Sequence, residues 1–492
     1  MNFQPRHFID GAWSDDLSSP RIEVVTPSTG AVLGHAADAS AEVVASAVDS
    51  ARRTFDETAW SSLSLVERAA VIERAADLLE PRVDDVAHLL TAQMGAPITV
   101  AKGMITGGLG TMRFLAQCAR EYSLVDVRDT DRGSAAVVKT PVGVVAAIAP
   151  WNGPWGMAIG KIIPALLAGC TVVFKPAPET PFDVGYLADA LTEAGLPAGV
   201  LNVVTGGPDT GRALVEHPGI DKISFTGSTV AGQRIAETVS TRFVRTQLEL
   251  GGKSAAIVLD DADMASVTAG IGTGCFFNSG QVCAALSRVL APRSRYGEVV
   301  TAVEKAASSW TPGDPFDPKT TLGPLVSRRQ RDRVENYIRL GRETGARLVS
   351  GGGRPAGMDS GWYVEPTVFA DVDNSMRIAR EEIFGPVVVV IPYDDLDDAV
   401  SIANDSDFGL HGAVFTRDPQ RALDVAQRIN AGTFSINNFV YNNRVPFGGV
   451  KSSGIGRDSG IEGFEAYFEL KTINFDETTR AALPSLRVGA SE

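Results

Sequence analysis

Cysteine and histidine are scarce in this chain, which has four cysteines and five histidines among its 492 residues. No CxxC pair occurs, and no group of cysteines and histidines has the spacing of metal ligands, so we expect neither a metal site nor a disulfide framework. Reduced thiols in a cytoplasmic protein are the simplest interpretation. The four cysteines are Cys118, Cys170, Cys275 and Cys283.

The chain also lacks a segment suited to a membrane. Its N-terminus, MNFQPRHFIDGAW, has neither the basic start nor the apolar core of a secretory signal. Residues 140–160 carry no charge, but this stretch contains Pro141, Pro150, Pro154 and several glycines. We therefore expect a buried strand followed by a functional turn there, and not a membrane-spanning helix.

Positive charge is in short supply as well. Asp and Glu outnumber Lys and Arg 59 to 45, which gives a net charge of −14. This balance argues against a general surface for nucleic acid or for an anionic membrane. The length suggests two or three domains, and a content of 44% hydrophobic and 21% charged residues is that of an ordinary globular protein.

Between residues 135 and 260, short β-branched runs alternate with longer segments whose apolar residues recur at helical spacing. This alternation predicts an α/β fold with a parallel, doubly wound sheet, which binds nucleotides beyond the carboxyl ends of its strands. The expected strands are 142–149, 171–175, 200–204, 222–225 and 254–259.

A second alternating series starts near residue 265 and predicts a second α/β domain. It contains a helical pattern at 331–345 and a strand pattern at 386–393. The segments 123–141 and 466–475 read as polar strands, and 477–492 reads as a loose tail.

Two strings carry chemistry. Cys283 ends NSGQVC, and Glu249 lies in LELGGK. A thiolate can attack an aldehyde, and a separate carboxylate can activate water to hydrolyse the resulting thioester. Taken singly, each has a plainer interpretation, since most lone cysteines are small buried hydrophobes and a glutamate before two glycines is most often a strand end.

Taken together, the motifs resemble those of the aldehyde dehydrogenase superfamily. The resemblance runs from FIDGAW at 8–13 to FEAYFELKT at 464–472. The strings that carry it are APWNGPW (149–155), FKPAPETP (174–181), SFTGST (224–229), LELGGK (248–253), NSGQVC (278–283), EEIFGPV (381–387) and PFGGVKSSGIGR (446–457). Seven strings in one order are much more specific than any one of them.

The resemblance implies the domain plan of that superfamily. Residues 1–122 and 142–250 would form a Rossmann-like, doubly wound cofactor-binding domain, and 251–450 a second α/β catalytic domain. Residues 123–141 and 464–480 would form a small β oligomerisation sheet bridging subunits of a homodimer or homotetramer.

The resemblance also implies a mechanism. Cys283 would be the nucleophile, Glu249 the base, and Asn152 an oxyanion donor together with the Cys283 amide. Helix-terminal amides and a nearby cofactor charge would lower the pKa of Cys283. Two alternatives stay open: a CoA-acylating dehydrogenase, which Glu249 disfavours, and a catalytically silent binding protein of the same fold.

The implied cofactor is NAD, with NADP as the alternative. Many NAD-dependent members carry Glu where this chain has Pro178, with Glu179 one residue later, and loss of that carboxylate removes a repulsion against a 2′-phosphate. The residues that match cofactor-binding positions are Trp151, Lys175, Gly207, Gly211, Gly227, Ser228, Glu382 and Phe384.

The substrate is the least determined feature. The positions that line the family's substrate tunnel are apolar here, which favours an uncharged aliphatic or aromatic aldehyde over a phosphorylated one. They are Gly153, Met157, Val282, Ala284 and Phe439. Arg444 could hold a carboxylate, although a solvent-facing loop arginine is the simpler interpretation.

Overall fold

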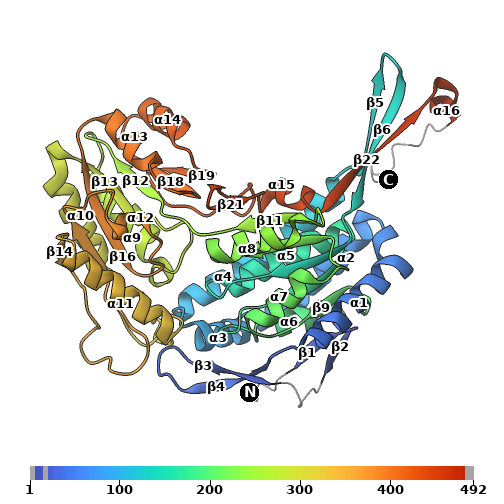
Figure 1. Ribbon diagram of the computed structural model, residues 1–492, viewed down its shortest axis with the longest axis horizontal. Coiled ribbons are helices and arrows are strands. Elements are labelled where there is room, and N and C mark those ends of the chain that lie inside the picture. The colour runs from blue at the N-terminus through green and yellow to red at the C-terminus, as the bar shows by residue number, and fades with distance from the viewer. Residues whose placement is uncertain (1–5, 15–19, 483–492) are drawn as a thin grey trace.

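The computed structural model describes residues 6–14 and 20–482. The chain forms two α/β lobes side by side, and a narrow three-stranded sheet projects from one of them (Figure 1). Residues 1–5 and 15–19 of the predicted cofactor domain lie outside the described part, as do residues 483–492 of the predicted tail.

The first lobe is built on an eight-stranded sheet. Its five central strands are parallel, while β2, β1 and β21 run antiparallel to their neighbours on the two sides. In spatial order the strands are β2 (Ala12–Ser14), β1 (His7–Ile9), β9 (Leu201–Val203), β8 (Thr171–Lys175), β7 (Val144–Ile148), β10 (Lys222–Thr226), β11 (Arg245–Glu249) and β21 (Gly454–Ile455). The strands predicted at 142–149, 171–175, 200–204 and 222–225 are all present in the predicted parallel arrangement.

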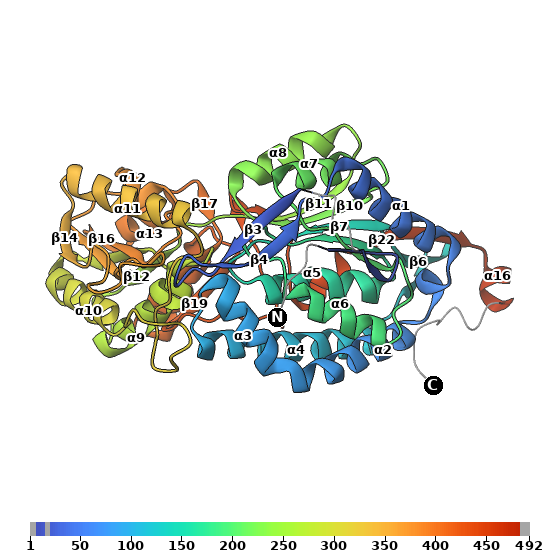
Figure 2. The same ribbon diagram turned by 90° about the horizontal axis from the view of Figure 1, so that it is seen from below.

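Helices cover both faces of this sheet because alternate residues of each strand point to opposite sides. Val145 and Ala147 pack against one group of helices, and Val144 and Ala146 against the other. The first group is α2 (Leu65–Leu79), α3 (Val83–Met94), α4 (Ile98–Glu121), α5 (Pro154–Ala168) and α6 (Val184–Glu193), of which α2, α3 and α4 run along one side of the lobe (Figure 2). The second group is α1 (Ala41–Glu57), α7 (Pro208–Glu216) and α8 (Thr229–Ser240).

The second lobe is built on a seven-stranded sheet, in which only the edge strand β14 is antiparallel to its neighbour. In order, the strands are β14 (Arg347–Ser350), β15 (Thr367–Ala370), β16 (Val387–Tyr393), β13 (Arg288–Pro292), β12 (Ala255–Val258), β18 (His411–Phe415) and β19 (Thr433–Ile436). The run at 254–259 therefore forms a strand, β12. Our prediction that this strand belongs to the same sheet as the strands at 142–225 was wrong, because β12 pairs with β13 and β18 of the second sheet.

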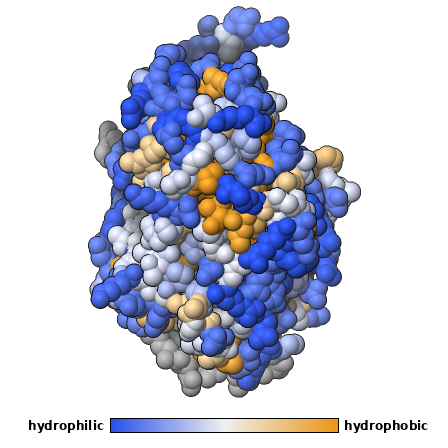
Figure 3. Space-filling view, turned by 90° about the vertical axis from the view of Figure 1, so that its left-hand side faces the viewer, coloured by the Kyte–Doolittle hydropathy of each residue, from blue (hydrophilic) through white to orange (hydrophobic). Residues whose placement is uncertain are grey.

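This sheet too has a hydrophobic core on each face. One core contains α9 (Met264–Phe276) and α10 (Tyr296–Ser308). The other contains α11 (Arg328–Glu343), α12 (Arg377–Arg380), α13 (Leu396–Asn404) and α14 (Pro419–Arg428). The outward face of this lobe is mostly hydrophilic, with hydrophobic residues gathered mainly near its centre (Figure 3).

The projecting sheet consists of β22 (Phe468–Phe475), β6 (Gly133–Pro141) and β5 (Val125–Thr130), in that order. The predicted tail begins instead with a short helix, α16 (Glu477–Ala482). The remaining elements are a hairpin of β3 (Arg21–Val25) and β4 (Val32–Ala37), the pair β17 (Phe408–Gly409) and β20 (Val450–Lys451), and helix α15 (Gly460–Glu465). Among the described residues, no helix is long and apolar enough to cross a membrane.

Candidate active site

The predicted site residues gather where the parallel strands of the first sheet end. Ile148 of β7 is in register with Lys175 of β8, and Thr226 of β10 is in register with Glu249 of β11. The strand order reverses between β7 and β10, so the loops that follow these two strands flank a crevice. Asn152 stands in the first of these loops and Gly227 in the second.

Cys283 stands in a turn just beyond the 3-10 helix η3 (Phe277–Gly280). Asn278 and Ser279 both have left-handed backbone conformations, with φ of 52° and 57°. Gly280 follows with φ of 69°, and a Cβ there would lie 2.2 Å from the carbonyl oxygen of Gly385. Only glycine fits at that position, so the NSGQVC string fixes a strained turn that presents Cys283.

Asn152 joins this turn to the first lobe. Its side-chain amide donates to the carbonyl oxygen of Gln281 over 2.9 Å, and Asn278 Nδ2 donates to the carbonyl oxygen of Asn152 over 2.8 Å. A side-chain amide has two N–H groups, and Gln281 takes one of them. The other makes no hydrogen bond to the described residues, and Asn152 lines the same cleft as Cys283, so Asn152 is a candidate oxyanion donor.

Glu249 is the last residue of β11, and its side chain is only 4% exposed. Neither carboxylate oxygen has a hydrogen-bond partner among the described residues. Burial raises the pKa of Glu249 well above its ordinary value, and Asp458 raises it further, whereas Lys161 and Arg457 lower it. A buried carboxylate without a partner is free to accept a proton from a water molecule.

The electrostatics of Cys283 differ from our expectation. Burial raises its pKa to about 12, and the Glu382 and Glu249 carboxylates act in the same direction. The backbone amides of Ala284 and Cys283 lower the pKa, but by less than burial raises it. We expected helix-terminal amides and a nearby cofactor charge to lower this pKa together; the amides do lower it, but the dense turn and the two carboxylates raise it by more.

A cleft of about 420 Å³ opens at Cys283, and five of the predicted cofactor residues line it together with Asn152. These five are Trp151, Gly227, Ser228, Glu382 and Phe384. The Trp151 and Phe384 rings meet edge to face, with centroids 5.3 Å apart. Glu382 accepts a hydrogen bond from the Gly252 amide over 3.1 Å, and burial raises its pKa to about 7.

The other three predicted cofactor residues are not among those lining this cleft. Lys175 ends β8, and a Cβ on Gly211 would lie 3.7 Å from its side chain. Burial lowers the pKa of Lys175 to about 8. The backbone amide of Gly207 donates to the Asp38 carboxylate over 2.8 Å, so this N–H is not free to bind a cofactor. These residues form a separate group at the ends of β8 and β9.

Several residues of the site were not predicted. Gln330 of α11 donates to the carbonyl oxygen of Phe384 over 2.7 Å, and Arg333 donates to that of Glu382, so α11 holds the EEIFGP loop. The basic run RRQRDR at 328–333 was a signal for this contact. Lys161 and Asp458, whose charges act on Glu249, form an ion pair of 3.1 Å across 297 residues, which no local pattern reveals.

An apolar cluster surrounds the other side of the cysteine. Ala284, Leu410 and Phe447 are buried there, and Val282 and Phe439 pack against them together with Cys283. Arg444 is exposed, with its guanidinium 5.4 Å from the centre of the Phe114 ring.

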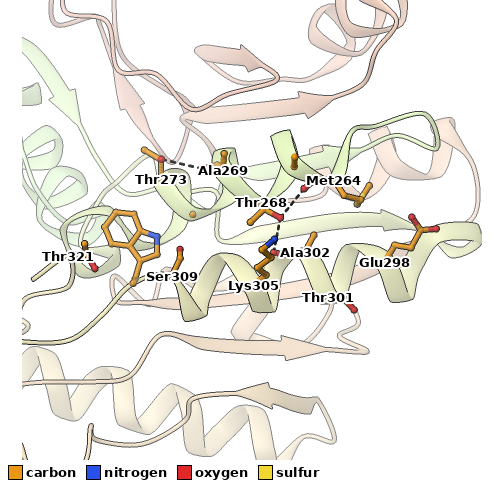
Figure 4. A pocket seen from close by; sticks show the side chains of 13 residues that line it. Met264, Thr268, Ala269, Thr273, Glu298, Thr301, Ala302, Lys305, Ser309 and Thr321 are labelled. Atoms are coloured by element: carbon orange, nitrogen blue, oxygen red, sulfur yellow. Dashed lines mark hydrogen bonds between the residues drawn. The ribbon is translucent and has the colours of Figure 1, made fainter. Parts of the chain in front are cut away.

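A wider groove of about 680 Å³ lies elsewhere, between α9 and α10 (Figure 4). The hydroxyl groups of Thr268 and Thr273 donate hydrogen bonds to backbone carbonyl oxygens of α9. Lys305 and Trp310 also line this groove. None of the predicted catalytic residues lines it, so the smaller cleft at Cys283 is the candidate active site.

Comparison with known proteins identifies the family to which the chain is similar. The profile of the aldehyde dehydrogenase family matches residues 13–473. Geranial dehydrogenase of Castellaniella defragrans is 45% identical over 96% of this chain and 99% of its own length. Betaine aldehyde dehydrogenase of Rhizobium leguminosarum is 40% identical over 96% and 98%.

Solved structures match equally well. An aldehyde dehydrogenase of Mycobacterium tuberculosis, determined with NAD+, superposes with a TM-score of 0.94 at 46% identity, covering 96% of this chain and 98% of that one. A mutant aldehyde dehydrogenase of Pseudomonas syringae, determined with NAD+ and octanal, gives 0.93 at 42% identity, covering 96% of each chain.

Proposed function

The chain belongs to the aldehyde dehydrogenase family, and from this premise we propose that Cys283, Glu249 and Asn152 carry out its reaction. That reaction is the oxidation of an aldehyde to the carboxylic acid, with NAD as the oxidant. One observation supports this assignment of residues. The partly exposed Cys283 lines the same cleft as Asn152, and the buried carboxylate of Glu249, which has no hydrogen-bond partner among the described residues, lies close enough to raise the pKa of Cys283.

The cleft has the features that a dinucleotide requires. Gly227 and Ser228 precede the first turn of α8, where backbone amides favour a pyrophosphate. Glu382 would accept hydrogen bonds from the nicotinamide ribose, and Phe384 would lie beside the ring. When bound, NAD supplies the hydride acceptor and a positive charge near the sulfur, which would oppose the effect of burial on the pKa of Cys283.

The first covalent step needs a thiolate and an oxyanion site. Cys283 Sγ forms a bond to the aldehyde carbon, and the carbonyl electrons move to its oxygen. The free N–H of Asn152 and the Cys283 amide donate to that oxygen. The oxyanion electrons then re-form the carbonyl as a hydride leaves the same carbon, which bound NAD would accept, and a thioester remains on Cys283.

The second step needs a base for water. Glu249 removes a proton from water, and the resulting hydroxide attacks the thioester carbon. The C–S bond breaks, the thiolate of Cys283 is restored, and the carboxylic acid leaves. This step distinguishes hydrolysis from acyl transfer to CoA, the runner-up reaction.

We infer that the substrate is an uncharged aliphatic or aromatic aldehyde. The supporting observation is the apolar cluster of Ala284, Leu410 and Phe447 beside Cys283. The named substrate of the Castellaniella relative, geranial, and the octanal bound to the Pseudomonas syringae enzyme are both apolar aldehydes.

The domain plan and the assembly are also proposals. Residues 1–122 and 142–250 would bind the cofactor, 251–450 would carry the nucleophile, and 123–141 with 464–480 would join subunits of a homodimer or homotetramer. Leu470 and Ile473 support the last point, because they are large apolar side chains exposed on the projecting strand β22. The four free cysteines support a cytoplasmic location.

One kinetic panel tests the proposed function. Purified protein is mixed with propanal, octanal or benzaldehyde and with NAD or NADP, with and without CoA, while absorbance at 340 nm reports reduced cofactor. We expect reduction in the absence of CoA and formation of the free acid. Turnover only with CoA would contradict the role of Glu249, and turnover by a folded Cys283→Ala variant would contradict the nucleophile.

A further inference from the structure

Arg329 lies where two cavities of the molecule meet. It is the second residue of α11, and its side chain is 86% exposed. It lines the candidate active-site cleft together with Gly227 and Ser228. It also lines a second cavity of about 480 Å³, whose walls include Pro178 and Glu179 of the loop that follows β8. Arg329 therefore adjoins both the proposed pyrophosphate site and this loop.

One ion pair connects Arg329 of the second lobe to the first lobe. Its Nη2 atom lies 3.3 Å from Glu179 Oε1. A pair with so exposed a partner contributes little to stability, so the guanidinium can leave Glu179 for a stronger partner. A phosphate group is such a partner, because arginine binds it through two parallel N–H···O bonds.

The loop that carries Glu179 lies where the second ribose of a dinucleotide would reach. Lys175 ends β8, and its side chain lies beside Gly211 of α7. The Glu179 carboxylate raises the pKa of Lys175 against the larger effect of burial, so these two charges lie close together. A dinucleotide bound at the start of α8 extends across the carboxyl ends of the parallel strands, and β8 is one of them.

A 2′-phosphate on that ribose would need a cation in the second cavity. The carboxylates of Glu23 and Glu179 line this cavity and would repel a phosphate. Among the described residues that line it, the cations are Arg328 and Arg329. The Arg328 guanidinium lies 5.0 Å from the centre of the Trp362 ring, whereas that of Arg329 lies against the loop. Arg329 is therefore the better placed of the two.

Arg212 offers an alternative cation, because it follows Gly211 on α7. Its side chain pairs with Asp209 of the same helix over 2.9 Å. Arg212 is not among the described residues that line either cavity. The geometry favours Arg329 for this reason.

We propose that Arg329 binds the 2′-phosphate of NADP, so that cofactor choice depends also on a residue of the second lobe. The guanidinium would leave Glu179 and donate two hydrogen bonds to phosphate oxygens. NAD has a hydroxyl group in place of this phosphate and leaves the Arg329–Glu179 pair intact. The inference rests on the proposed function, because it assumes a dinucleotide in the cleft at Cys283.

Binding of the reduced cofactors tests this proposal without requiring catalysis. NADH or NADPH is titrated with the natural protein and with each variant, and cofactor fluorescence gives a Kd for each. The variants are Arg329→Ala, Arg329→Lys and Glu179→Gln. Arg339→Ala is the matched control, because Arg339 is a 61% exposed arginine of the same helix that also pairs with a glutamate, Glu343, over 2.6 Å.

We expect Arg329→Ala to raise the Kd for NADPH about tenfold or more, the usual effect of losing a charge-assisted hydrogen bond, and to change the Kd for NADH less than about twofold. Arg329→Lys should give an intermediate Kd for NADPH, because lysine keeps the charge without the paired N–H groups. Glu179→Gln should lower the Kd for NADPH by up to about fivefold, since it releases Arg329 from an exposed ion pair. Arg339→Ala should change neither Kd.

Equal weakening of NADH and NADPH in Arg329→Ala would overturn the inference, because Arg329 would then bind the pyrophosphate. An unchanged Kd for NADPH in Arg329→Ala would also overturn it, and a raised one in Arg212→Ala alone would assign the phosphate to Arg212. A natural protein that binds NADH but not NADPH would overturn it as well. If the natural protein bound neither cofactor, the proposed function would fail instead.

Discussion

The side-chain amide of Asn152 donates to the carbonyl oxygen of Gln281 over 2.9 Å, across the boundary between the two lobes. Asn152 follows β7 of the first sheet, whereas Gln281 belongs to the turn that presents Cys283 from the second lobe. Because this bond uses one N–H, it fixes the direction of the other. Asn152 therefore joins the lobes and lines the same cleft as Cys283, which supports its proposed role as an oxyanion donor.

Replacing Asn152 with alanine should lower kcat by roughly 10²–10³, the usual loss for one oxyanion donor. Steady-state kinetics with octanal and NAD measure this. Thr171→Ala is a suitable comparison because Thr171 is also buried and bonded to another element, but begins β8 at the end opposite Lys175. A loss below about threefold for Asn152→Ala would mean that the residue serves only to join the lobes.

Glu249→Gln should slow thioester hydrolysis more than hydride transfer, since only hydrolysis needs a base for water. Rapid mixing should show a burst of reduced cofactor followed by a slow steady state. The raised pKa of Glu249 predicts that the acid limb of the natural pH profile lies above the range of an ordinary carboxyl group. Loss of the burst itself would place Glu249 in the first step.

We propose that cofactor choice depends on the loop that follows Lys175. Pro178→Glu should raise kcat/KM for NAD relative to NADP, because a carboxylate would bind the ribose hydroxyls and repel a 2′-phosphate. Kinetics with both cofactors at one saturating aldehyde concentration give the ratio. Glu179, which pairs with Arg329 over 3.3 Å, supplies the comparison. An unchanged ratio in Pro178→Glu together with a changed one in Glu179→Gln would move the selecting contact to Glu179.

The same loop ends at a buried acid, Asp183, whose pKa burial raises to about 7. Gln93 donates to one oxygen over 2.6 Å, and the other oxygen has no partner among the described residues. The folded protein therefore keeps a proton that the unfolded chain loses above pH about 4, so stability falls as the pH rises toward 7. The loss is on the order of 4 kcal/mol and is complete above pH 7.

Asp183→Asn should remove this loss, because asparagine keeps the acceptor for Gln93 and carries no charge. Thermal-unfolding midpoints at pH 5 and pH 8 should differ less in this variant than in the natural protein. Asp209→Asn, which alters a side chain that is 89% exposed, is the control. Equal pH dependence in all three proteins would contradict a buried proton on Asp183.

The sequence predicts strands well where apolar runs are bounded by turn residues, as at β7, β8 and β10. It does not reveal which sheet a strand joins. We assigned β12 to the wrong sheet because its neighbours, β13 and β18, lie 30 to 160 residues away in the sequence. Motif strings singled out Cys283, Glu249 and Asn152 as candidate catalytic residues. They could not show that Asp458 and Lys161 flank Glu249, or that dense packing raises the pKa of Cys283, because both depend on contacts formed only in the folded chain.

The central claim is that the aldehyde becomes covalently attached to Cys283, and peptide mass spectrometry tests it directly. Glu249→Gln is mixed with octanal and NAD, quenched in acid and digested. We predict one octanoyl group on the peptide that contains Cys283 and none on that of Cys275, which is buried and donates to the Leu286 carbonyl over 2.7 Å. The double variant Cys283→Ala/Glu249→Gln should show no adduct and no reduced cofactor. Reduced cofactor without an adduct, or an adduct on another cysteine, would contradict the account.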